Sequence, residues 1–285
     1  METKVQEKWV EVEGLRIHYL RAGEQGSPVL LLHGGGLDCA SLSYRLSIGP
    51  ISQHHRVFAP DWPGYGESDQ PKVEYSTEYY VHFLGRLMDA LGLERASLAG
   101  LSMGGGIALG FSLESPHRVE KLVLVDSYGL GSEVPWPAIS YLVVWMPLLY
   151  EMTYAVMRRS RWMVRLSLQN LVCNRRVVTD DLVDEVYRLV KKPGVEKAFR
   201  SFQRSEARWN GLRTNFVDRL PELAVPTLIL HGEKDRLVPV SWAERAHSLI
   251  SGSELRVFPE CGHWLVREKT EEFNRAVLEF LGKDG

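Results

Sequence analysis

Gly100-Leu101-Ser102-Met103-Gly104 is the stretch of sequence that decides the fold. Residues 95–99 before it predict a short buried strand, and residues 105–113 after it are small and apolar at helical spacing. A serine on the tight turn between a strand and a helix is a nucleophile elbow. The glycines two residues on either side leave room for a strained backbone. We therefore predict that Ser102 is an exposed nucleophile.

The size and charge of the chain limit the class of protein. With 285 residues it can bury a large core, and we expect one domain that carries an insertion. Apolar residues make up 45% and charged residues 25%, as is ordinary for a globular protein. The net charge of −2 gives no general attraction to nucleic acid or anionic membranes. The most apolar segment, 138–149, is too short to span a bilayer.

The N-terminal residues and the cysteines bear on the cellular compartment. Residues 1–8 are charged and lack the apolar segment of a secretory signal. The three cysteines, at positions 39, 173 and 261, are odd in number and none is in CxxC spacing. We therefore expect reduced thiols in a cytoplasmic protein, with neither a disulfide framework nor a metal site.

Apolar runs and helical patterns alternate along both ends of the chain. Such alternation predicts an α/β fold with a parallel sheet covered on both faces. The predicted strands are a hairpin of 8–13 and 15–20, then 28–33, 56–61, 95–99, 121–126, 226–231 and 255–258. The predicted helices are 77–91, 105–114, 242–250 and 268–281.

The pattern changes between residues 127 and 219. No run there is strand-like, and helical stretches rich in aromatics and arginine are broken by prolines. We interpret 127–219 as a helical cap, or lid, inserted into a core made of residues 1–126 and 220–285. The aromatic side chains of this cap are expected either to pack together or to cover an apolar pocket.

A serine needs a base that takes its proton and an acid that orients that base. Asp235 and His263 each lie in a loop after a late predicted strand, so the chain order is serine, acid, histidine. Loops at the carboxyl ends of parallel strands share one crevice, where the three side chains can meet. Asp126, after the preceding strand, is the alternative acid, or it caps a helix of the cap together with Ser127.

Glycines after another buried strand supply the fourth part of the site. In His33-Gly34-Gly35-Gly36, the Gly35 N–H can approach a substrate without a side chain in the way. We predict that this N–H and that of Met103 form an oxyanion hole. His33 is expected to hold the loop through hydrogen bonds, while His54 and His55 are read as a surface pair. Neither glycine triplet has the G-x-G-x-x-G spacing of a dinucleotide-binding turn.

Together these motifs resemble the α/β-hydrolase superfamily over essentially the whole chain. The further matching pieces are Asp61-Trp62-Pro63-Gly64-Tyr65-Gly66-Glu67-Ser68, Gly232-Glu233-Lys234-Asp235 and Gly262-His263-Trp264. The resemblance implies a doubly wound, mostly parallel sheet of about eight strands, with a helical cap after the sixth. It also implies hydrolysis of a small-molecule substrate through an acyl-enzyme, with no metal or organic cofactor.

Within the superfamily the chain looks most like the meta-cleavage product hydrolases, which cut C–C bonds, and like related esterases and enol-lactonases. Leu101 stands where the C–C hydrolases usually have asparagine. Val186 stands where they use a cap arginine for the substrate carboxylate, with Arg188 nearby. Since ester hydrolysis needs neither residue, we expect a serine carboxylesterase acting on a small to medium apolar ester or lactone, and keep C–C cleavage as the alternative.

Two further readings of the same site stay open: a ligand-sensing receptor that kept its pocket, and a perhydrolase. A monomer or a homodimer is expected. The residues that we predict to line the substrate pocket are His33, Gly34, Gly36, Leu101, Trp136, Val238 and Trp264.

Overall fold

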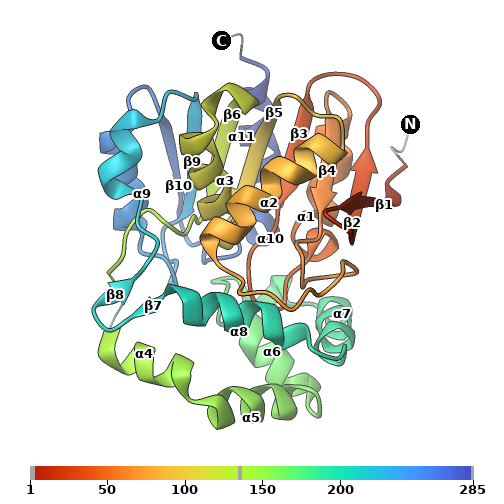
Figure 1. Ribbon diagram of the computed structural model, residues 1–285, viewed down its shortest axis with the longest axis vertical. Coiled ribbons are helices and arrows are strands. Elements are labelled where there is room, and N and C mark those ends of the chain that lie inside the picture. The colour runs from red at the N-terminus through yellow and green to blue at the C-terminus, as the bar shows by residue number, and fades with distance from the viewer. Residues whose placement is uncertain (1–3, 134–136, 284–285) are drawn as a thin grey trace.

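The central strands are buried on both faces. The computed structural model describes residues 4–133 and 137–283, and all five residues of β3 (Pro28–Leu32) are buried in it. Val29 and Leu31 belong to one apolar cluster, whereas Leu30 and Leu32 belong to a second. Because successive residues of a strand point to opposite faces, the sheet lies between two layers of helices (Figure 1).

The sheet has eight strands in the order β1-β2-β4-β3-β5-β6-β9-β10, which confirms the predicted doubly wound sheet. β1 pairs antiparallel with β2, and β2 with β4, while the remaining pairs are parallel. The other strands are β1 (Gln6–Val12), β2 (Leu15–Ala22), β4 (Arg56–Pro60), β5 (Ala96–Leu101), β6 (Val119–Val125), β9 (Thr227–Gly232) and β10 (Glu254–Phe258).

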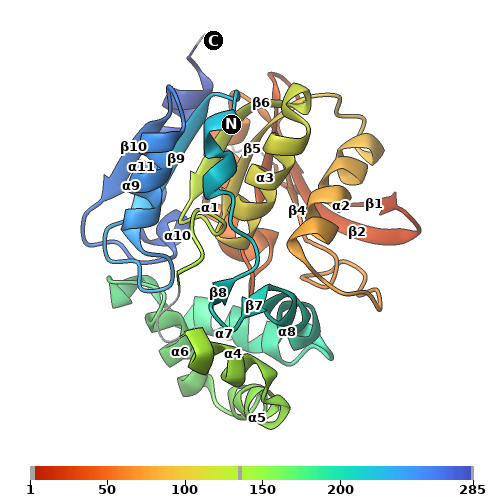
Figure 2. The ribbon, with the colours of Figure 1, turned by 60° about the vertical axis from the view of Figure 1, so that its left-hand side comes forward.

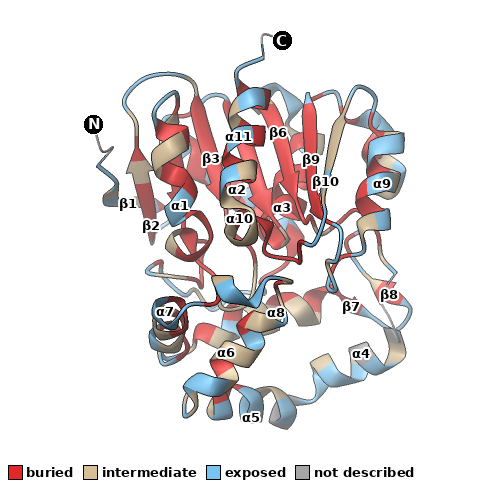
Figure 3. Cartoon of the chain, turned by 180° about the vertical axis from the view of Figure 1, so that it is seen from behind, coloured by how far each residue is buried: buried red, intermediate tan, exposed pale blue. Residues whose placement is uncertain are grey.

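Helices cover the two faces of the sheet (Figures 1 and 3). α1 (Ala40–Ser52), α10 (Leu265–Glu268) and α11 (Thr270–Leu281) contribute to the first apolar cluster. α2 (Thr77–Ala90), α3 (Met103–Glu114) and α9 (Val240–Leu249) contribute to the second. Three short 3-10 helices are η1 (Pro116–Arg118), η2 (Arg175–Val177) and η3 (Val217–Glu222).

The central strands end level with one another. Leu32 of β3 is paired with Gly100 of β5, and Leu101 of β5 with Val125 of β6. Val125 is in turn paired with Leu230 of β9. The loops that follow these strands therefore emerge side by side at one edge of the sheet, which is where the site is built.

The helices between β6 and β9 lie together beyond that edge of the sheet (Figures 1 and 2). They are α4 (Pro137–Trp145), α5 (Pro147–Met157), α6 (Arg161–Gln169), α7 (Asp180–Val190) and α8 (Val195–Glu206). No helix among the described residues is long and apolar enough to cross a membrane. The division into a cap of 127–219 and a core stays a prediction.

The structure corrects the sequence reading at three places. The segment 127–219 contains a short hairpin, β7 (Ala207–Arg208) with β8 (Gly211–Leu212), where no strand was expected. α1 was not predicted at all. His55 is buried rather than on the surface, because its ring lies 3.4 Å from the Ser27 hydroxyl and it packs beneath the turn before β3.

Candidate active site

Ser102 lies on a strained turn between β5 and α3. Its backbone has φ 51° and ψ −116°, in the region that favours glycine. The turn is tight, because a β-carbon on Gly100 would lie 2.3 Å from the Gly104 carbonyl oxygen. A β-carbon on Gly104 would lie 2.3 Å from the Leu32 carbonyl oxygen. Glycine at both positions therefore allows the elbow to form against β3, and Ser102 faces the cavity.

Ser102, His263 and Asp235 form one chain of hydrogen bonds. The Ser102 hydroxyl lies 3.0 Å from Nε2 of His263, and Nδ1 of His263 lies 2.7 Å from Oδ2 of Asp235. The other oxygen of Asp235 accepts the N–H groups of Leu237 (2.7 Å) and Val238 (3.0 Å). Asp235 holds the proton on Nδ1, so Nε2 is free to accept the proton of the serine.

His263 and Asp235 shift each other's pKa values. Burial is the largest single effect on both pKa values and opposes charge, but the hydrogen bonds and nearby opposite charges together outweigh it. The hydrogen bond and charge of Asp235 raise the pKa of His263 above its usual value, and Asp126 and Asp38 add to the rise. Conversely, the pKa of Asp235 is lowered by His263 and by the Val238 N–H. The imidazolium that forms when His263 takes a proton is thus stabilised.

Asp126, the alternative acid, has a different set of partners. Its Oδ1 accepts the Gly232 N–H at 2.8 Å and its Oδ2 the Leu265 N–H at 3.2 Å. It therefore joins the end of β9 to the start of α10, and among the described residues it caps no helix between β6 and β9. Burial raises its pKa well above the usual value. Asp235, and not Asp126, lies at hydrogen-bond distance from His263.

Asp126, His231 and Asp235 offer atoms within 4.8 Å of one another, a spacing that a metal ion could bridge. Hydrogen bonds account for this grouping. Nε2 of His231 lies 3.0 Å from the Val238 carbonyl oxygen, and both carboxylates hold the partners given above. The cluster is therefore part of the hydrogen-bonded framework that supports Asp235.

The predicted oxyanion donors lie on either side of Ser102. Gly35 and Met103 both line the cavity, and neither N–H donates to an acceptor among the described residues. A β-carbon on Gly35 would lie 2.5 Å from the ring of Phe199 on α8, so a larger residue there would displace this ring. The two N–H groups are therefore free to bind an anion beside the Ser102 hydroxyl.

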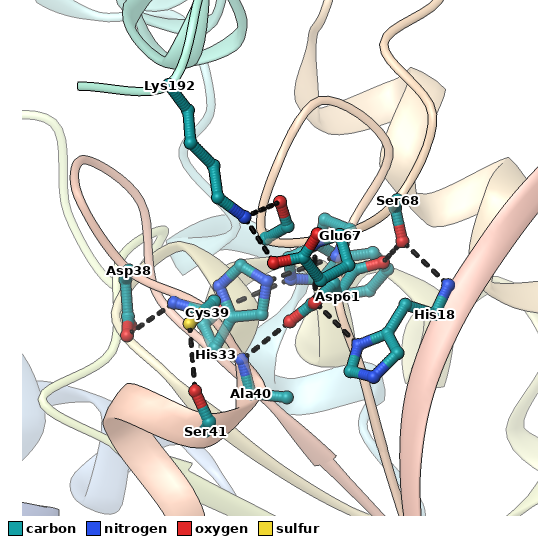
Figure 4. Close-up of polar contacts among 12 residues, drawn as sticks. His18, His33, Asp38, Cys39, Ala40, Ser41, Asp61, Glu67, Ser68 and Lys192 are labelled. Carbon is teal, nitrogen blue, oxygen red and sulfur yellow. Dashed lines mark hydrogen bonds and ion pairs between the residues drawn. The ribbon is translucent and has the colours of Figure 1, made fainter. Parts of the chain in front are cut away.

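His33 supports this loop from behind (Figure 4). Its Nδ1 lies 2.8 Å from the Gly34 carbonyl oxygen, and its Nε2 accepts the Trp62 N–H at 3.1 Å. A ring that donates from Nδ1 and accepts at Nε2 is neutral. His33 is fully buried and does not line the cavity, so its predicted place in the substrate pocket is not found.

A buried, hydrogen-bonded carboxylate braces the same region (Figure 4). Asp61 follows β4, and its Oδ2 lies 2.8 Å from Nδ1 of His18 on β2. Its carboxylate also accepts the N–H groups of Ala40 (2.8 Å) and Glu67 (3.0 Å). Lys192, after α7, reaches this loop through an ion pair with Glu67. The motif 61–68 thus links β2, α1 and the helices beyond the sheet.

The cavity above Ser102 has a volume of about 560 Å³. Most of its wall is apolar or aromatic, including Tyr150 and Tyr154 of α5 and Phe199 of α8. Of the residues predicted to line it, Gly34, Gly36, Leu101, Val238 and Trp264 do so, whereas Trp136 lies outside the described residues.

Residues 37–45 supply parts of the site that the sequence reading missed. Asp38 lines the cavity, and the Ser43 hydroxyl lies within 3.4 Å of the Trp264 indole nitrogen. Their position directly after the glycine loop was the only feature of the sequence that could have indicated a place in the site. On α7, Val186 lines the cavity while Arg188 is exposed.

A model described as the alpha/beta hydrolase family matches residues 29–276. The chain belongs to this family. The hydrolase is 34% identical over 262 residues to a 2-hydroxy-6-oxo-2,4-heptadienoate hydrolase from Pseudomonas putida, covering 91% of this chain and 90% of that one.

Two further comparisons point the same way. The hydrolase is 33% identical over 285 residues to a 2-hydroxy-6-oxo-6-phenylhexa-2,4-dienoate hydrolase from Comamonas testosteroni, covering 98% of this chain and 94% of that one. A solved structure of a meta-cleavage product hydrolase from Pseudomonas fluorescens matches with a TM-score of 0.82 and 33% identity, covering 96% of each chain. The predicted resemblance to this group is confirmed.

These relatives overturn the expectation of a carboxylic ester or lactone as the main substrate. Those at 31–34% identity over most of the hydrolase are named for 2-hydroxy-6-oxo-dienoates and related semialdehydes. The ester reading was wrong because it gave two positions, Leu101 and Val186, more weight than the rest of the chain. The alternative, C–C bond hydrolysis, is the better supported.

Proposed function

We propose that this hydrolase cleaves the C–C bond next to the 6-oxo carbon of a 2-hydroxy-6-oxo-dienoate, with Ser102 as nucleophile. The observation that carries the proposal is the likeness to dienoate hydrolases over more than nine-tenths of the chain. The hydrogen-bonded Ser102, His263 and Asp235 support it, because they are the side chains that such a reaction needs.

The first half of the reaction forms a bond between Ser102 and the substrate. His263 takes the hydroxyl proton as the serine oxygen attacks the 6-oxo carbon. The carbonyl oxygen becomes an oxyanion, held by the N–H groups of Gly35 and Met103. Each such donor contributes roughly 3–4 kcal/mol to the stability of the transition state in comparable sites.

The second half releases two products. When the dienoate is in its 2-oxo tautomer, the electron pair of the breaking C–C bond is delocalised through the conjugated chain onto the 2-oxygen. The proton on His263 neutralises this leaving group, which departs as a 2-hydroxydienoate. Water, activated by His263, then cleaves the ester to Ser102 and releases a carboxylic acid. One water is consumed for each bond broken.

Loss of the visible absorbance of a dienoate tests the proposal. We expect wild-type protein to consume 2-hydroxy-6-oxo-6-phenylhexa-2,4-dienoate, and Ser102→Ala to be slower by at least about 10³-fold. Ser112→Ala is the matched control, since Ser112 is also buried on α3 but its hydroxyl bonds the Ala108 carbonyl and lies outside the cavity. Equal rates for wild type and Ser102→Ala would contradict the proposal.

A further inference from the structure

Helices α4 and α5 present a row of apolar side chains to solvent. Ile139, Leu142, Val143 and Met146 follow one another at helical spacing, so they point to one side of α4. We define the outer face as the large apolar residues of this helix pair that are at least 42% exposed: Ile139, Leu142, Val143, Trp145, Met146, Leu149, Met152 and Val156. An exposed apolar face of this kind marks a surface that contacts a partner.

The other side of the same two helices belongs to the cavity. Tyr141 and Val144 of α4 line it, as do Tyr150, Tyr154 and Met157 of α5. α8 lies between this helix pair and the sheet, and α4 and α5 form the end of the molecule opposite the C-terminus (Figures 1 and 3). α4 and α5 are therefore apolar on two sides, and no described element of the chain covers the outer one.

Tryptophan side chains flank the outer face. The ring of Tyr141 lies 6.0 Å from the rings of both Trp145 and Trp209, so the turn between β7 and β8 lies beside α4. Trp162, at the start of α6, is exposed as well. Tryptophan is enriched where a lipid bilayer meets water, because its ring is apolar and its indole N–H is polar.

The segment that carries the outer face is basic. From the start of α4 to the end of β8, residues 137–212 hold 13 lysines and arginines and 7 aspartates and glutamates, a formal charge of +6. Because the whole chain has a net charge of −2, the remaining residues carry −8. The low net charge therefore conceals two parts of opposite sign, and the basic part is the one that an anionic surface attracts.

Six of the seven acidic side chains in this segment already have partners. Four pair with arginines of the same segment, namely Glu151, Asp180, Asp184 and Glu196. Glu185 pairs with Arg45 of α1. Glu206 is buried and accepts the Thr77 hydroxyl at 2.9 Å. These acidic groups are therefore not available to repel an anionic surface.

Two arginines lie at the outer face without an acidic partner. Arg159 is exposed and follows α5, between Val156 and Trp162, and its only hydrogen bond to a described residue is to the Ala155 carbonyl oxygen. The guanidinium of Arg204 on α8 lies 5.2 Å from the centre of the Trp145 ring. Neither forms an ion pair with a described residue. Cations beside exposed tryptophan and aliphatic side chains are the composition of a helix pair that lies on an anionic bilayer.

We propose that the outer face docks on the surface of an anionic lipid bilayer, with its apolar side chains among the headgroups and Arg159 and Arg204 on lipid phosphates. This inference does not depend on the proposed function. A second copy of the chain would bring an equal positive charge against the first, which opposes pairing through this face. α4 and α5 have 9 and 11 residues, too few to span a bilayer, so they lie along its surface.

Sedimentation with lipid vesicles tests the docking without any turnover. Wild-type protein should bind vesicles of phosphatidylcholine that contain about one-quarter phosphatidylglycerol, and bind pure phosphatidylcholine at least about tenfold more weakly. Raising NaCl from about 50 mM to about 500 mM should weaken binding to the mixed vesicles by a similar factor, because salt screens the charge.

A double variant tests the apolar part of the outer face. Leu142→Gln combined with Met152→Gln should weaken binding to the mixed vesicles about tenfold or more. These side chains are 52% and 55% exposed, so urea unfolding should show unchanged stability. Leu46→Gln is the matched control, since Leu46 is 47% exposed but lies on α1, and its binding should equal that of wild type.

A second pair of variants tests the charge. Arg159→Gln should weaken binding to the mixed vesicles roughly fivefold, as expected for one cation near an anionic surface. Arg275→Gln should have no effect, because Arg275 is also exposed but lies on α11.

Three results would overturn the docking. The first is equal binding to neutral and mixed vesicles, or no binding to either. The second is equal binding by the double variant and Leu46→Gln. The third is a double variant with half the mass of wild type by light scattering without vesicles, which would make the outer face a contact between two copies. None of these results bears on C–C cleavage, which is measured separately.

Discussion

Trp62 donates two hydrogen bonds to His33, one from its backbone and one from its side chain. The Trp62 backbone N–H donates to Nε2 of His33, and the Trp62 indole N–H donates to the His33 carbonyl oxygen, both at 3.1 Å. Both residues are fully buried. The loop after β4 therefore fixes the start of the glycine loop, whose N–H at Gly35 we assign to the oxyanion hole.

Replacing Trp62 by phenylalanine tests this link. Trp62→Phe leaves the buried His33 carbonyl without its donor, so we expect unfolding to become easier by about 1–3 kcal/mol. We also expect kcat on a dienoate to fall more than KM rises, because the oxyanion is bound only in the transition state. Urea unfolding and steady-state kinetics measure the two effects. Trp209→Phe is the control, since Trp209 is 62% exposed, and an equal change in both variants would refute the link.

Gly66 tests the packing around Asp61. Its φ is +53°, and a β-carbon there would lie 2.0 Å from Oδ2 of Asp61. Gly66→Ala should therefore lower the free energy of unfolding by about 3 kcal/mol or more. Gly92 has a similar φ of +67° but nothing within 4 Å, so Gly92→Ala should cost only the backbone strain of about 1–2 kcal/mol. Equal losses in urea unfolding would show that Asp61 does not restrict residue 66.

The loss of activity at low pH depends on the protonation of His263, which Asp235 influences. A general base works only when neutral, and the pKa of His263 is raised in the folded protein. Activity should therefore be lost as the pH falls through a value above the usual one for histidine. Asp235→Asn removes the negative partner, so this loss should move to lower pH while the rate falls by up to about 10⁴-fold. If the loss of kcat/KM at low pH occurred at the same pH in Asp235→Asn as in wild type, the pairing of Asp235 with His263 would be contradicted.

The cysteines should differ in reactivity. Burial raises the pKa of the Cys39 thiol to about 12, and Asp61 and Asp38 add to the rise. Cys261 is fully buried and its pKa is raised further, whereas Cys173 is only partly buried. Because the thiolate is the reacting form, iodoacetamide at pH 8 should label Cys173 first. Peptide mass spectrometry checks this, and early labelling of Cys39 would contradict it.

The sequence predicted the parts of the molecule that carry a strong local pattern. Continuous apolar runs mark the strands around β3, and glycine spacing marks the turn at Ser102. The chain order of Asp235 and His263 was enough to predict that they share one site, because parallel strands end at a common edge of the sheet. Family likeness was equally readable, because its motifs are spread over the whole chain.

Features without a local pattern could not be predicted. α1 has no side-chain cap and contains Gly49 and Pro50, which usually signal a helix end. β7 and β8 have two residues each, too few for periodicity to show. The partners of Glu206 are contacts made only on folding, since Thr77 is 129 positions away.

Product analysis is the most direct test of the central claim, that Ser102 breaks a C–C bond. Wild-type protein is mixed with 2-hydroxy-6-oxo-6-phenylhexa-2,4-dienoate, and the products are quantified by liquid chromatography. We predict one benzoate and one 2-hydroxydienoate for each substrate consumed, with neither formed above background by Ser102→Ala. Intact dienoate recovered from the wild-type reaction, or benzoate released equally by both proteins, would contradict it.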